Sequence, residues 1–160
     1  MSASGDPHEK IMSWRRAREW RDAQRGVVVF TNGVFDLLHP GHVDVLLGAR
    51  REGDALVVGV NSDESVRRLK GPARPVRTAA ERCYVLAALQ MVDAVVEFTQ
   101  DTPRDLIAEL RPDVLVKGGD YNEASIVGAA EVRARGGRIV VIPLTPGHST
   151  TSTIQRLRDV

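Results

Sequence analysis

Five short apolar runs, rich in Val, Ile, Leu and Ala, alternate along the chain with segments of helical character. The runs cover residues 27–30, 55–60, 93–98, 114–116 and 138–142. Apolar residues fill them continuously instead of occupying every second position, which is typical of strands buried on both faces. The pattern therefore predicts an α/β fold: a Rossmann-like, doubly wound, five-stranded parallel sheet with helices on both faces.

The intervening helices are predicted from apolar spacing and capping residues. They cover residues 40–52, 62–69, 78–90, 103–110, about 124–135 and 149–158. Thr78 with Glu81 three residues later is a capping-box signature. Pro103 suits the first position of a helix. The glycines and prolines within 70–77 indicate a loop.

The composition fits one domain with an aliphatic core. The chain has 160 residues, of which 42% are hydrophobic and only 4% aromatic. We assign residues 26–160 to a single domain and residues 1–25 to an N-terminal helical extension. In that extension Trp14, Ala17 and Trp20 form the apolar side of a helix.

Charge and hydropathy exclude several classes of protein. Lys and Arg total 22 and Asp and Glu total 21, so overall charge does not favour nucleic-acid binding. Apolar runs such as 84–89 are far shorter than the roughly 18 residues of a membrane helix. The charged start of the chain does not resemble a secretory signal. We expect a cytoplasmic protein without a nucleic-acid or membrane partner, and a core position for its single cysteine, Cys83.

The segment after the first strand, residues 31–42, carries the strongest functional signal. Ligands of doubly wound sheets bind at the carboxyl ends of strands. Pro40 and Gly41 begin the next helix, whose free N–H groups suit phosphate. His39 and His42 lie three residues apart, so both rings can donate hydrogen bonds to one bound phosphate. The alternative is that the histidines only cap and pack this helix.

Three further segments follow strands or begin helices. Lys70, Arg74 and Arg77 lie on a loop that either closes over phosphates or is solvated surface. Residues 117–120 follow the fourth strand and face the first-strand loop if the strand order is 3-2-1-4-5. The hydroxyls of residues 149–151 either cap the last helix or form a second phosphate cradle. No Gly-x-Gly-x-x-Gly follows the first strand, and no Walker A sequence is present, which argues against a nicotinamide dehydrogenase and a P-loop enzyme.

The His39-x-Gly41-His42 element, preceded by Gly33-x-Phe35-Asp36, resembles the cytidylyltransferase-like nucleotidyltransferase superfamily. More specifically, residues 10–158 resemble the adenylyltransferase half of bifunctional heptose enzymes. The matching stretches are 30–42, 59–63, 68–71, 74–75, 115–121 and 149–151. That family makes ADP-D-glycero-β-D-manno-heptose from ATP and the heptose 1-phosphate. The resemblance therefore implies ATP and a sugar phosphate as substrates, with Mg²⁺ bound through the triphosphate and no metal held by protein alone.

The resemblance also implies a role for each matching residue. The catalytic residues are His39, His42 and Lys70, which contact the triphosphate. The nucleotide-binding residues are Thr31, Asn32, Gly33, Val34, Phe35, Gly41, Lys117, Gly118, Gly119, Asp120, Ser149, Thr150 and Thr151. The substrate-binding residues are Asp36, Asn61, Arg74 and Arg82. For Asp36 the alternative is a turn-capping role, and His148 and Arg77 depart from the family pattern.

Two other functions remain open at this point. A CTP-dependent cytidylyltransferase that acts on glycerol 3-phosphate, or on a related phosphate or phosphonate, shares the histidine element. A non-catalytic nucleotide-binding module binds a triphosphate without releasing pyrophosphate. If the chain is the adenylyltransferase, a separate kinase is expected to supply the heptose 1-phosphate. By analogy with the superfamily we expect a homodimer.

Overall fold

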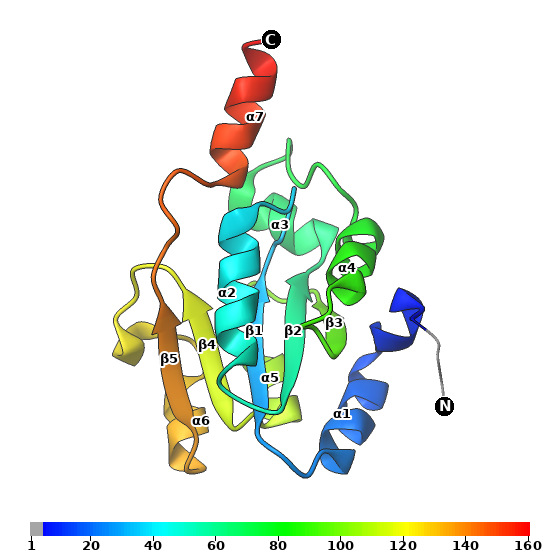
Figure 1. Cartoon of the computed structure of the whole chain (residues 1–160), viewed down its shortest axis with the longest axis vertical. Helices are drawn as coiled ribbons and strands as arrows, with labels where there is room; N and C mark the ends of the chain where they lie inside the picture. Colours follow the sequence, from blue (N-terminus) through cyan, green and yellow to red (C-terminus); the bar gives the residue numbers. More distant parts are fainter. Residues whose placement is uncertain (1–4) are drawn as a thin grey trace.

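The computed structural model describes residues 5–160 and builds them around a parallel sheet. Its strands are β1 (Val28–Gly33), β2 (Ala55–Asn61), β3 (Ala94–Phe98), β4 (Val114–Gly118) and β5 (Arg138–Ile142). Every pair is parallel and the order is β3-β2-β1-β4-β5 (Figure 1). The predicted doubly wound topology is confirmed.

Helices cover both faces of the sheet. They are α1 (Trp14–Ala23), α2 (Pro40–Arg50), α3 (Asp63–Lys70), α4 (Ala79–Ala88), α5 (Arg104–Leu110), α6 (Ala129–Ala134) and α7 (Thr150–Arg158), with short 3-10 helices η1 (Pro7–Lys10) and η2 (Glu123–Ser125). Buried residues of α1, α5 and α6 pack on one face of the sheet, and those of α2 and α4 pack on the other. In Figure 1, α7 projects beyond the carboxyl ends of the strands.

The N-terminal extension packs onto the sheet through α1, as predicted. Ala17 is fully buried in the core, and Trp14 and Trp20 pack against the same cluster. The Trp14 indole donates a hydrogen bond to the backbone carbonyl of Glu97 at 2.9 Å. Cys83 is buried in the opposite core cluster, and burial raises the pKa of its thiol to about 12. No helix within residues 5–160 is both long and apolar enough to cross a membrane.

Several predicted helix ends differ from the structure by one or two residues, and one predicted helix is divided. The helix expected at about 124–135 is divided into η2 and α6. Gly128 stands at the division with a φ of +85°, a left-handed conformation that a continuing right-handed helix cannot contain. Pro103 caps α5 from outside, so that the helix begins at Arg104.

Aspartates hold the amino ends of the strands in place. Three of them stand directly before β2, β3 and β4 and accept backbone N–H groups of neighbouring strands: Asp54 from Val27, Asp93 from Leu56 and Asp113 from Val28, at 2.7–2.8 Å. Asp113 also lies 3.1 Å from Nη2 of Arg21, which joins α1 to the same point. These contacts fix the strand register below the functional end of the sheet.

We predict that Asp113→Ala lowers the free energy of unfolding by about 1–3 kcal/mol, because the N–H of the buried Val28 loses its side-chain acceptor. Urea unfolding measures this change. The exposed Asp105→Ala on α5 is the control and should cost less than about 1 kcal/mol. Equal stability of the Asp113 variant and the unmodified chain would contradict this role.

Candidate active site

The two central strands separate at their carboxyl ends. β1 pairs with β2 at six positions but with β4 at only two, Val29 with Val114 and Phe30 with Leu115. Beyond these pairs a crevice opens at the point where the strand order reverses, which is where doubly wound sheets bind ligands. A cavity of about 350 Å³, here called the central cavity, occupies it, within the size range of small-molecule sites.

Most of the predicted site residues meet at this central cavity. Its lining includes Asn32, Gly33, Val34, Phe35, Asp36, His39, Gly41, His42, Lys70, Arg74, Lys117, Gly118, Ser149, Thr150 and Thr151. The structure thus brings together the β1 loop, the start of α2, the basic loop and the start of α7. These segments are far apart in the sequence.

Both histidines present the same ring atom as a donor. His39 precedes α2, and its Nδ1 accepts the backbone N–H of Gly41 at 3.1 Å. Nδ1 of His42 accepts the backbone N–H of His39 at 3.3 Å. A neutral imidazole that accepts at Nδ1 carries its proton on Nε2. Each ring therefore has an Nε2–H group for a ligand oxygen, and the two rings stack with centroids 3.8 Å apart.

The histidines are held in the neutral form. Burial, with a smaller contribution from the neighbouring His39 and against the opposing effect of Asp36, lowers the pKa of His42 to about 4. Burial also lowers the pKa of His39, with a smaller contribution from His148. Neutral rings stack without mutual repulsion and still donate hydrogen bonds. An anion bound beside them would raise both pKa values.

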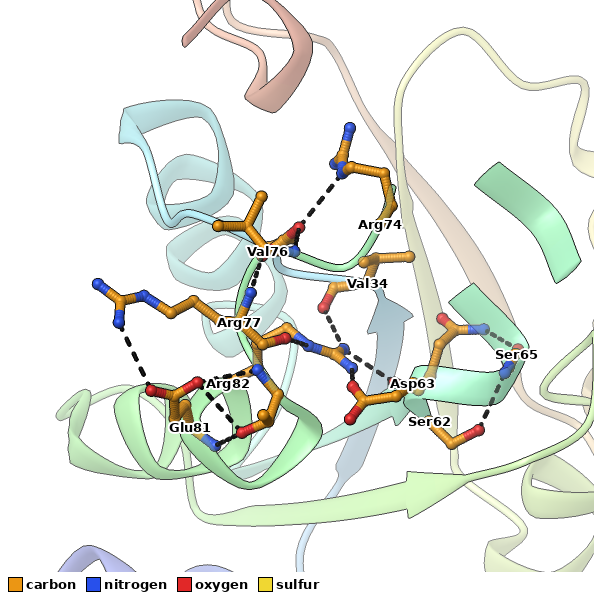
Figure 2. Close-up of polar contacts among 12 residues, drawn as sticks. Val34, Ser62, Asp63, Ser65, Arg74, Val76, Arg77, Glu81 and Arg82 are labelled. Atoms are coloured by element: carbon orange, nitrogen blue, oxygen red, sulfur yellow. Dashed lines mark hydrogen bonds and ion pairs between the residues drawn. The ribbon is translucent and has the colours of Figure 1, made fainter. Parts of the chain in front are cut away.

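Asp36 anchors the basic loop. Its buried carboxylate accepts the backbone N–H groups of Val76 at 2.7 Å and Arg77 at 3.0 Å, and Nε of Arg74 at 3.3 Å. Figure 2 shows these three loop residues around the contact. The Asp36 carboxylate was expected near the acceptor. Its observed contacts hold the basic loop in place, which is closer to the alternative turn-capping role.

Arg82 supports the site from beneath, and the structure gives no support to the expectation that it contacts substrate. The residue is 2% exposed. Its guanidinium donates to the carbonyl oxygens of Val34 at 2.7 Å, Asn61 at 2.8 Å and Arg77 at 3.0 Å, and to the Asp63 carboxylate at 2.8 Å (Figure 2). These bonds tie the end of β1, the end of β2, the start of α3 and the basic loop to one buried cation.

Other predicted residues lie at the edge of the cavity or outside it. Thr31 is buried within β1, Gly119 is buried and Asp120 is exposed, and none of the three lines the central cavity. Asn61 lines a neighbouring cavity instead. The predictions that place Thr31, Gly119 and Asp120 in direct contact with nucleotide therefore receive no support from the cavity lining.

The hydroxyl groups at the start of α7 both cap the helix and lie at the central cavity, so the two interpretations are compatible. Ser149 Oγ caps the helix by accepting the backbone N–H of Ser152 at 3.0 Å. The hydroxyl of Thr150 donates to the backbone carbonyl of Asp36 at 2.6 Å, which fastens α7 to the β1 loop. The same residues face the central cavity.

Sequence reasoning did not place His148, Val45, Tyr121, Leu144 and Thr145, which also line the central cavity. The His148 ring lies with its centroid 6.3 Å from that of His39, at an interplanar angle of 16°. The only sequence signal for a role of His148 was its departure from the family pattern. Tyr121 ends the matching stretch 115–121, but no role was assigned to it. Val45, Leu144 and Thr145 belong to no matching stretch and reach the lining only through folding.

The fold and this site define a nucleotidyltransferase of the doubly wound α/β class. Residues 30–156 match the model of the cytidylyltransferase-like family. The chain belongs to the cytidylyltransferase-like family, as the histidine element predicted.

Similar proteins agree with this assignment. The chain is 59% identical over 89% of its length to the bifunctional protein HldE of Acidiphilium cryptum, and 52% identical over 97% to that of Magnetococcus marinus. It spans 29% and 32% of the length of these two relatives. Among solved structures, the lipopolysaccharide core biosynthesis protein from Thermoplasma volcanium aligns with a TM-score of 0.62 and 27% identity, covering 75% of this chain and 97% of that one. The pantoate-beta-alanine ligase from Francisella tularensis shares the fold, with a TM-score of 0.58 and 13% identity over 94% of this chain and 78% of that one.

We predict that the His42 ring titrates with a midpoint of about 4 in the absence of ligand, because burial disfavours its charged form. A proton NMR titration of the Cε1–H signals measures this, and the signal lost in His42→Asn assigns the residue. Because the unfolded state protonates near pH 6.5, stability should also fall as the pH drops from about 6.5 to about 4. A His42 midpoint near 6.5 would refute the neutral histidine pair.

Proposed function

We propose that this chain transfers the adenylyl group of ATP to D-glycero-β-D-manno-heptose 1-phosphate, forming ADP-heptose and pyrophosphate. The observation that carries the proposal is the pair of Nε2–H donors, on His39 and His42, at the start of α2 in the central cavity. Identity of 59% to a bifunctional HldE, whose adenylyltransferase half this sequence resembles, supports the choice of nucleotide and sugar.

The transfer is an in-line displacement. An oxygen of the acceptor phosphate forms a bond to the α-phosphorus of ATP, and the bond from that phosphorus to the bridging oxygen of the β-phosphate breaks. Pyrophosphate leaves with the electron pair. The attacking phosphate is already anionic, so the chain needs no strong general base. Its residues orient the reactants and neutralise charge.

The residues of the cavity divide this work. His39 and His42 donate hydrogen bonds to triphosphate oxygens at the N-terminus of α2, where free backbone N–H groups add to the attraction. Lys70 and Arg74 bring positive charge from the basic loop. As negative charge moves onto the leaving pyrophosphate, donors held in place by the fold stabilise it without rearranging.

The lining of the central cavity fits a magnesium ion that arrives with the nucleotide. Within the described chain, Asp36 carries the only carboxylate of this lining, and its oxygens already accept hydrogen bonds from the basic loop. No group of three or more His, Cys, Asp or Glu side chains among residues 5–160 is arranged to hold a metal. Mg²⁺ would therefore be held by triphosphate oxygens and water, where it neutralises phosphate charge.

The proposed substrates also set the cellular context. ATP and a sugar phosphate are the partners, and the reaction takes place in the cytoplasm without nucleic acid or membrane. A kinase that phosphorylates carbon 1 of the heptose supplies the acceptor. The homodimer implied by the family resemblance belongs to the same proposal.

Pyrophosphate release tests the function. We expect release with ATP and the β anomer of the heptose 1-phosphate, and none with CTP, GTP, UTP or the α anomer. Replacing His39 or His42 with Asn should lower kcat by about a hundred-fold or more, because each substitution removes a donor to the phosphates. His8→Asn is the matched control, since His8 lies on η1 outside the central cavity, and it should keep the unmodified rate.

Three other results would contradict the proposed function or its mechanism. Release with CTP and glycerol 3-phosphate would identify a cytidylyltransferase. Triphosphate binding without release for every acceptor would identify a non-catalytic module. A His42→Asn variant with near-normal turnover would remove the histidine pair from the mechanism.

A further inference from the structure

A second cavity, here called the side cavity, adjoins the central cavity and is not used by the mechanism above. It has a volume of about 390 Å³ and lies among the ends of β1 and β2, the loop after β3 and the segment around η2. The two cavities share the lining residues Asn32, Gly33, Val34, Lys70, Lys117 and Tyr121. They therefore meet at a common rim on which both lysines stand.

Asn61 presents a hydrogen-bond acceptor to the side cavity. Ser65 Oγ donates to the carbonyl of Gln100 at 3.0 Å, so it must accept from Nδ2 of Asn61, also at 3.0 Å. This pairing fixes the orientation of the Asn61 amide and leaves its Oδ1 without a partner among residues 5–160. Asn61 is 5% exposed, yet no fully buried side-chain nitrogen or oxygen among residues 5–160 lacks a partner, so Oδ1 is open to the side cavity, where a ligand can donate to it.

The rim of the side cavity is positive. Lys117 is half-buried, and burial lowers the pKa of its ammonium group. Its Nζ lies 5.3 Å from the centroid of the Tyr121 ring, and no carboxylate in the part of the chain that the structure describes forms an ion pair with it. Lys70 lies at the same rim. A half-buried cation without a counterion favours an anionic ligand.

The part of the side cavity away from the rim is polar and includes a carboxylate. Asp101 and Thr102, in the loop after β3, line the side cavity only, as does Ser125 of η2. The Asp101 carboxylate pairs with Arg68 at 2.8 Å, and the Ser125 hydroxyl donates to the carbonyl of Asn122. Such groups accept hydrogen bonds from sugar hydroxyls, and none of these three residues offers a positive charge to a phosphate.

We propose that the side cavity binds the acceptor of the proposed reaction, a sugar phosphate, in a single orientation. Its phosphate lies at the rim between Lys70 and Lys117, and its hydroxyls contact Asn61, Asp101 and Thr102. This inference rests on the proposed function and adds residues that determine which acceptor is used.

The arrangement gives the displacement a direction. The acceptor phosphate approaches the α-phosphorus from the side cavity and forms the new P–O bond at the rim. The bond to the β-phosphate breaks on the opposite side, and pyrophosphate departs with the electron pair into the central cavity, toward His39, His42 and the start of α7. Attacking and leaving oxygens then lie on opposite sides of the α-phosphorus, as in-line transfer requires.

Thr102→Val tests the side cavity. The substitution keeps the side-chain shape and removes a hydroxyl that bonds to no other described residue. We expect the KM for the sugar phosphate to rise by about five- to ten-fold, the effect of one lost hydrogen bond, with the KM for ATP unchanged. Thr99→Val is the matched control, because Thr99 is exposed nearby and lines neither cavity, and both KM values should stay unchanged.

A second variant and a binding measurement complete the test. Asn61→Ala should weaken binding of the sugar phosphate in calorimetry without ATP, while the affinity for a non-hydrolysable ATP analogue is retained. Unchanged acceptor KM and affinity in both variants would overturn the side-cavity inference and leave the proposed function intact. A rise in the KM for ATP instead would place the nucleotide there. If the unmodified chain releases no pyrophosphate with any sugar phosphate, the proposed function and this inference fail together.

Discussion

The site depends on how little β1 and β4 pair. After Phe30 and Leu115 their ladder ends, although each strand keeps its other neighbour over its full length. The carboxyl ends can then separate without leaving the sheet unsupported, and the crevice between them receives a ligand. Gly118 lets α2 pack closely on the end of β4 beside the crevice, since a Cβ there would lie 2.6 Å from Cγ2 of Val45 on α2.

Buried polar groups convert this crevice into a rigid anion site. Arg82 and Asp36 together hold the basic loop and the ends of two strands. Their charges are satisfied within the protein, so the positive groups at the rim of the cavity remain for a ligand. The histidines add donors without adding charge, because burial keeps the pKa of each below its ordinary value. The site is thus prepared for phosphate before phosphate arrives.

Sequence patterns predicted what depends on local spacing. The apolar runs specified the parallel sheet, and the positions of His39 and His42 around the start of a helix specified phosphate donors. Patterns could not distinguish arginines that differ only in burial: Arg82 is covered by packing, whereas Arg74 reaches the cavity. The break at Gly128 depends on its left-handed backbone conformation, which the pattern of side chains does not record. The side cavity could not be predicted from the sequence, because segments that are far apart in the chain form it.

The central claim is that the α-phosphorus of ATP lies at the rim where the two cavities meet. A crystal structure with a non-hydrolysable α,β-methylene analogue of ATP and the heptose 1-phosphate tests it directly. We expect the β- and γ-phosphates beside His39 and His42, the α-phosphate at the rim near Lys117, and the sugar in the side cavity. Phosphates bound away from the histidine pair, or a nucleotide base filling the side cavity, would contradict the claim.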